Sequence, residues 1–152
     1  MNWERNVNLL AMGLMGCVIY YCVKGALTIE GQIPIHFNLS GTADQWAPAY
    51  WLYILAALSL FLHLVLGFVI QNPQHWNTLG QRSQEELQNI IPIGKKGISL
   101  LRLVIAAMLW GITLNITHGP QPWVFQWFLP ALLLGLIGIV IWLMVKMPKK
   151  KC

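Results

Sequence analysis

The sequence is poor in charge, and this shortage excludes most classes of soluble protein. Only 10% of its 152 residues are charged, whereas 57% are hydrophobic. A soluble domain usually carries about a quarter charged residues, so too little polar surface remains here to cover a globule. Much of the exterior must therefore face lipid. At about 20 apolar residues per span, the length accommodates four spans and leaves no room for a soluble domain with its own core.

The sequence also lacks the short motifs of the common enzyme and nucleotide-binding families. It contains no Gly-x-Ser-x-Gly, His-Glu-x-x-His, P-loop or Gly-x-Gly-x-x-Gly pattern. Its cysteines, Cys17, Cys22 and Cys152, show neither metal-ligand nor redox spacing. No acidic residue falls within an apolar segment, which disfavours a proton-coupled transporter. We therefore expect a non-enzymatic protein with no cofactor and no bound metal.

Four apolar segments predict an all-α integral membrane fold, with four transmembrane helices in two hairpins. A single membrane domain over residues 1–152 would have its spans at about residues 7–23, 49–70, 98–116 and 123–145. Before the third span, Ser83-Gln84-Glu85-Glu86 has the form of a capping box and leads into apolar positions on one helical face. This pattern predicts a short cytoplasmic amphipathic helix, ended by Pro92 and Gly94.

The basic residues predict topology rather than binding to nucleic acid. The net charge is +5, and Lys and Arg gather at the C-terminus and in the loop between the second and third spans. By the positive-inside rule, both termini and that loop are cytoplasmic, and the loops at residues 25–48 and 117–122 are on the outer side. Arg102, one turn into the third span, is expected to snorkel toward the headgroups beside Lys95 and Lys96.

The outer loop at residues 33–46 is unusually rich in polar and turn-forming residues. Apolar residues alternate with Pro34, His36 and Asn38, which is a strand-like period, and Ser40-Gly41 is typical of a turn. A chain that extends and then reverses there would bring His36 close to Asp44. Such a pair can act as a pH-sensitive pair, a general base or half of a metal site.

Simpler interpretations of the same residues stay open. Asp44 would cap the second span, Asn38 would satisfy loop backbone, and His36 and Trp46 would sit at the membrane interface. His118, in the other outer loop, would supply a third ligand if a zinc site formed with His36 and Asp44.

His63 lies near the middle of the second span. An ionisable residue at that depth is a candidate proton relay or an intramembrane polar contact. We favour a neutral imidazole that is hydrogen-bonded to a neighbouring helix.

The pattern Ile33-Pro34-x-His36-Phe37-Asn38-x-x-Gly41-x-x-Asp44-x-Trp46, just after a first span, closely resembles a bacterial domain of unknown function. Its best-known carriers are the SdpI-like membrane proteins. The resemblance implies a polytopic helical protein of the bacterial cytoplasmic (inner) membrane. In the type member it also implies immunity to a secreted peptide toxin and recruitment of a cytoplasmic regulator. Two departures are Ala49, where the family has a basic residue, and the shorter length of this chain.

Three functional hypotheses follow. In the first, the protein is an immunity-like or envelope-sensing factor whose outer loop recognises a peptide toxin or another membrane protein. The residues that would form this surface are Pro34, His36, Phe37, Asn38, Gly41, Asp44 and Trp46. In the second, it is a small accessory subunit of a larger membrane complex. In the third, it is a metal-dependent membrane enzyme that uses His36, Asp44 and His118.

Overall fold

The computed structural model describes residues 3–38, 40–76, 83–119, 121 and 123–146. Its long helices are α1 (Trp3–Thr28), α2 (Trp51–Gln71), α3 (Gln84–His118) and α4 (Leu129–Lys146). A 3₁₀ turn, η1 (Pro73–His75), follows α2, and a π-helical turn, η3 (Val124–Phe128), leads into α4. Four helices are long and apolar enough to cross a membrane, with η3 counted as part of the last. The expected four-span helical fold is confirmed.

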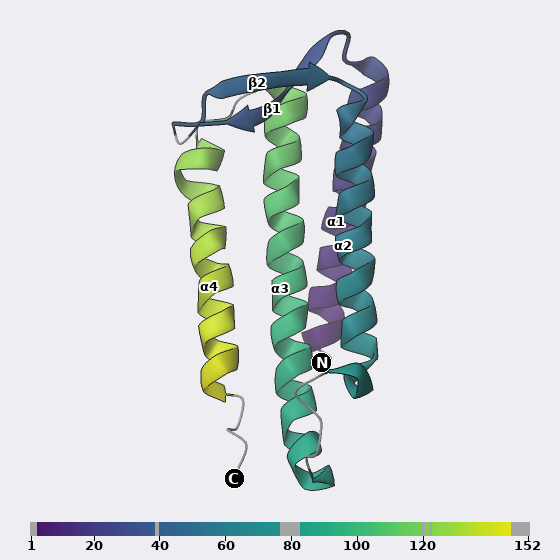
Figure 1. The fold of residues 1–152 in the computed structure, drawn as a ribbon, viewed down its shortest axis with the longest axis vertical. Coiled ribbons are helices and arrows are strands. Elements are labelled where there is room, and N and C mark those ends of the chain that lie inside the picture. Colours follow the sequence, from purple (N-terminus) through teal and green to yellow (C-terminus); the bar gives the residue numbers. More distant parts are fainter. Residues whose placement is uncertain (1–2, 39, 77–82, 120, 122, 147–152) are drawn as a thin grey trace.

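The helices run side by side, and a small sheet lies across one end of them (Figure 1). This sheet pairs β1 (Gln32–Phe37) with β2 (Ala43–Pro48) in antiparallel order, and we call residues 32–48 the β-ribbon. α1 begins and α4 ends toward the opposite end of the helices (Figure 1). We call that end, where Lys96 and Lys146 are found, the basic end.

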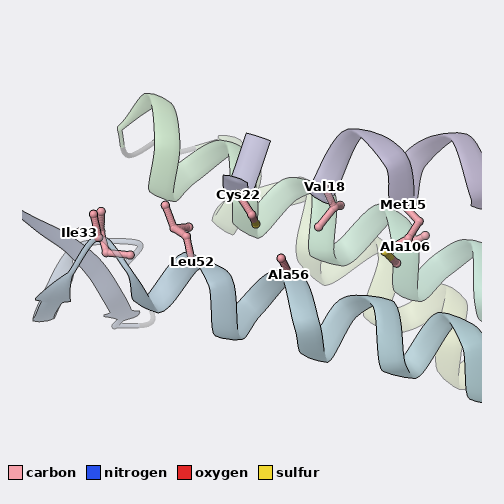
Figure 2. Close-up of a cluster of buried hydrophobic side chains, with 8 residues drawn as sticks. Met15, Val18, Cys22, Ile33, Leu52, Ala56 and Ala106 are labelled. Carbon is pink, nitrogen blue, oxygen red and sulfur yellow. The ribbon is translucent and has the colours of Figure 1, made fainter. Parts of the chain in front are cut away.

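The core forms where α1, α2 and α3 meet (Figure 2). α1 contributes residues four or three apart, which lie on one helical face, and α2 and α3 supply small or medium side chains against them. Ile33 of the β-ribbon joins the same cluster, so the ribbon is anchored in the core. The labelled members are Met15, Val18, Cys22, Ile33, Leu52, Ala56 and Ala106.

α3 corrects one expectation about the loop before the third span. The capping box at Ser83 and Glu86 is present, with both reciprocal hydrogen bonds, as predicted. The amphipathic helix that it starts does not end at Pro92 and Gly94, however, but continues as one helix of 35 residues. A proline removes one backbone hydrogen bond, and packing on either side can hold the helix together across it. Here Gly94 packs against Trp76, and Gly97 packs against Leu143 of α4.

The start of the fourth span is also irregular. Pro130, the second residue of α4, has no N–H to donate to the carbonyl of Gln126. The turn before it is wider than an α-helical turn, and the Leu129 N–H donates to the Val124 carbonyl. The fully buried side chain of Asn115 accepts a hydrogen bond from the Gln121 backbone N–H at 2.7 Å, which ties the incoming chain to α3. α4 then packs mainly on α3, and none of its residues is buried.

Candidate functional site

The β-ribbon contains the polar outer-loop residues, and its strands follow the predicted extension and reversal. Ile33 pairs with Ala47 and Pro34 with Trp46, after which the register shifts. Because of this irregularity the simple alternation is lost. Ile33 and Pro34 are both buried, whereas Ile35 and His36 are both exposed. The ribbon therefore has an inner part that is buried against the helices and an outer part that is exposed.

The turn of the ribbon is built around Asn38. Its side-chain oxygen accepts hydrogen bonds from the backbone N–H groups of Ser40 and Thr42, at 3.1 and 2.9 Å, and from the Ser40 hydroxyl at 2.7 Å. The Asn38 N–H also donates to the Thr42 carbonyl at 2.9 Å. The interpretation of Asn38 as a residue that satisfies loop backbone is confirmed.

Replacing Asn38 by alanine should loosen this turn without disturbing the helices. Three hydrogen bonds lose their acceptor, and a loss of ~1–3 kcal/mol in local stability is the usual consequence. We expect faster amide exchange in peptides that cover residues 36–44, measured by mass spectrometry on the detergent-solubilised protein. Asn38→Asp keeps an acceptor oxygen and is the matched control. Equal exchange in both variants would show that the side-chain oxygen does not hold the turn.

The turn docks on the start of the fourth span through Phe125. The rings of Phe37 and Phe125 lie 4.6 Å apart between centroids. Gly41 adopts φ +80°, and a Cβ added to it would lie 3.2 Å from Phe125. The sequence suggested that Phe37 supplies apolar contact to a partner, whereas the structure packs its ring against Phe125. Together with buried Pro34, Phe37 and Gly41 position the ribbon.

His36 and Asp44 meet on the exposed part of the ribbon. The Nδ1 atom of His36 lies 2.5 Å from Oδ1 of Asp44, and their side chains are 57% and 44% exposed. The predicted approach of these two residues is therefore confirmed. The alternative role of Asp44 as a helix cap is wrong, because α2 has Tyr50 at its N-cap and no side-chain cap. An exposed ion pair contributes ~0–1 kcal/mol to folding, so the fold does not depend on this one.

Apolar surface lies beside the pair. Trp46 is 53% exposed on β2, and Ile35 is exposed on β1. An apolar cavity of about 270 Å³ opens between β1 and the helices, lined mainly by Ile33, Ile35, Trp51, Leu55, Leu58 and Ile116. The exposed part of the ribbon therefore carries one polar pair together with apolar side chains.

His118 does not join His36 and Asp44. Its ring packs against Tyr21, with 5.3 Å between ring centroids, and its Nδ1 lies 2.9 Å from the Thr117 hydroxyl. Among the residues that the structure describes, no group of three His, Cys, Asp or Glu side chains comes together as metal ligands. The zinc site considered from the sequence is not assembled.

His63 is buried in the bundle, 7% exposed, but the hydrogen bond expected for it is missing. Neither ring nitrogen has a partner within the described part of the chain. The guanidinium of Arg102 lies over Gly67, one turn along α2, and donates to Asn8 of α1 at 3.2 Å instead. Arg102 of α3 therefore contacts both α1 and α2.

Phe125 is the functional neighbour that the sequence did not single out. It is one aromatic residue among several at the start of an apolar segment, and no local pattern distinguishes it from its neighbours. Its contact with the ribbon turn joins residues more than eighty positions apart, which periodicity cannot detect.

A comparison with protein-family models finds a similar domain. A family model described as "Domain of unknown function (DUF1648)" matches residues 13–60, which is about a third of the chain. No curated protein and no solved structure matches the chain. The matched segment runs from α1 through the whole β-ribbon into α2, so the chain is similar to this domain over the segment that contains the candidate site.

Proposed function

We propose that the protein is a non-enzymatic membrane protein that uses the outer part of its β-ribbon to recognise a partner. The observation that carries the proposal is the exposed His36–Asp44 pair, flanked by exposed Trp46 and Ile35. The pair would orient the partner through hydrogen bonds, and Trp46 would supply buried apolar area. Aromatic residues beside a polar pair are typical of the centre of a binding surface.

The shape of the ribbon favours an extended peptide as the partner. The described sheet has two strands, so each strand has one edge without a neighbouring strand. An extended peptide can add to such an edge through backbone hydrogen bonds, and side-chain pockets then supply specificity. The cavity next to Ile35 is apolar and would accept an apolar side chain. The resemblance to SdpI-like proteins supports the proposal that this peptide is a secreted toxin and that the protein is an immunity-like or envelope-sensing factor of the bacterial cytoplasmic membrane.

Replacing either His36 or Asp44 by alanine should abolish protection against the toxin while leaving membrane insertion intact. Losing a central polar contact costs about 2 kcal/mol in binding, which weakens the dissociation constant ~30-fold. The measurement is survival of bacteria that produce each variant when they are exposed to the peptide toxin. Gln45→Ala, an exposed neighbour outside the pair, is the control. Unchanged protection in both variants would contradict recognition by the pair, and no protection by the unaltered chain would contradict the immunity role.

The second candidate function is that of an accessory subunit, and α4 supports it. None of the residues of α4 is buried, and large side chains such as Leu134, Ile141 and Met144 are exposed on it. A partner helix could cover this face. Purification in a mild detergent distinguishes the two, because a stoichiometric larger complex favours the subunit and a free monomer or homodimer favours the recognition protein.

A further inference from the structure

A second surface feature lies far from the β-ribbon, between α3 and α4 at the basic end. It is a groove of about 330 Å³, lined by Lys96, Leu100, Gly135, Gly138, Ile139 and Trp142. The two glycines lie where a Cβ would meet nothing within 4 Å, so the groove is open over them. All of its lining residues except Lys96 are apolar or aromatic.

Lys96 stands between two tryptophans at the end of this groove. Its Nζ atom is 5.1 Å from the ring centroid of Trp3 and 5.9 Å from that of Trp142. The His36–Asp44 contact is the only one within 4 Å between a basic side chain and a carboxylate among the described residues, so no carboxylate in that part of the chain lies within 4 Å of the Lys96 ammonium group. The groove thus holds one cation without an acidic partner.

The groove lies close to the end of α4. Gly97, the residue after Lys96, packs on Leu143, and α4 ends three residues later at Lys146. Tryptophan and lysine near the ends of spanning helices are typical of the membrane–water interface. Gly138 and Gly135 lie one and two helical turns before Trp142 in α4. They are therefore farther than Trp142 from the end of α4, toward the interior of the membrane.

We propose that this groove binds an anionic phospholipid of the leaflet at the basic end, with its phosphate on Lys96 and an acyl chain over Gly135 and Gly138. Charge complementarity favours a lipid with net negative charge, because the one charged group in the groove is a cation with no carboxylate within 4 Å among the described residues. The positive-inside assignment makes this leaflet the cytoplasmic one, where anionic lipids attract basic residues. An apolar helix is disfavoured as the occupant, since it would cover the ammonium group without giving it a partner.

The test compares Lys96→Gln with Lys95→Gln, which removes the same charge from the adjacent residue outside the groove. The full-length protein is purified in detergent, incubated with equal amounts of phosphatidylglycerol and phosphatidylcholine of the same acyl chains, and analysed by native mass spectrometry. We expect the unaltered protein to retain phosphatidylglycerol preferentially. Lys96→Gln should lower that preference about fivefold, since one lysine near an anionic surface contributes ~1 kcal/mol. Lys95→Gln should change it less than about twofold.

A third variant tests where the acyl chain lies. Gly138→Leu places a side chain in open space, so the helices can keep their arrangement while the groove is filled. It should reduce retention of both lipids. Equal losses of preference in Lys95→Gln and Lys96→Gln would overturn the proposal in favour of general surface charge. Unchanged retention in Gly138→Leu would overturn the placement of the lipid in the groove.

Discussion

Replacing Gly41 by alanine is expected to release the turn of the β-ribbon from the fourth span. Gly41 has φ +80°, which costs a residue with a side chain ~1–2 kcal/mol, and its new Cβ would lie 3.2 Å from Phe125. Crowding at a packed contact adds ~1–3 kcal/mol. Together these terms are comparable to the stability of a small two-stranded sheet, so amide protection over residues 32–48 should fall at least about tenfold in hydrogen-exchange measurements.

Gly31→Ala is the matched control for this change. Gly31 also has a positive φ, +107°, but a Cβ there would meet nothing within 4 Å. It imposes backbone strain on the start of the ribbon without any contact to Phe125. If crowding against Phe125 adds to the backbone strain, Gly41→Ala should expose residues 36–44 more than Gly31→Ala does. Identical exchange in the two single variants would leave backbone strain as the whole effect.

Replacing Gly94 by alanine should lower the stability of the protein, because it disturbs the packing of the helices at the basic end. A Cβ at Gly94 would overlap Cζ3 of Trp76, and an indole ring cannot bend away as a flexible side chain can. Displacing the ring also breaks the hydrogen bond from Nε1 of Trp76 to the Val69 carbonyl, 2.8 Å long. We expect a net loss of ~2 kcal/mol and a fall of about 4–8 °C in Tm, measured by thermal unfolding in detergent.

Gly135→Ala separates this effect from helix propensity. Alanine is favoured over glycine inside a helix by ~1 kcal/mol, so propensity alone would raise the stability of both variants. At Gly135 the added methyl group meets nothing within 4 Å, and Tm should stay level or rise. A rise of the same size in Gly94→Ala would mean that Trp76 yields to the methyl group without cost.

Hydropathy and local spacing predicted most of the fold. Four apolar runs correspond to four helices, because a membrane requires every backbone group within it to be hydrogen-bonded internally. The capping box at Ser83 is likewise local, since its two hydrogen bonds join residues three apart. The prediction that the amphipathic helix ends at Pro92 and Gly94 was wrong, because non-local packing continues the helix. The contacts of Gly94 with Trp76 and of Gly97 with Leu143 join distant segments, and they outweigh the local signals to stop.

In the candidate site, too, local contacts were predictable from the sequence and long-range contacts were not. His36 and Asp44 are eight residues apart across a turn, so extension and reversal were enough to predict that they meet. Which residues face inward was not predictable, because the register shift after Pro34 breaks the alternation and Phe125 comes from the other end of the chain. For His63, burial was predictable because an ionisable residue in a span usually faces the bundle interior, but its lack of a partner depends on where Arg102 points.

The length of α3 has a mechanical consequence. At 1.5 Å per residue, its 35 residues make a rod about 52 Å long, whereas the hydrocarbon core of a bilayer is about 30 Å thick. α3 contacts β1 near one end and packs against Trp76 near the other. A tilt of ~10° about the ribbon end would move the first residue of such a rod by about 9 Å. A small change where the ribbon meets the helix would thus become a large movement on the opposite side of the membrane.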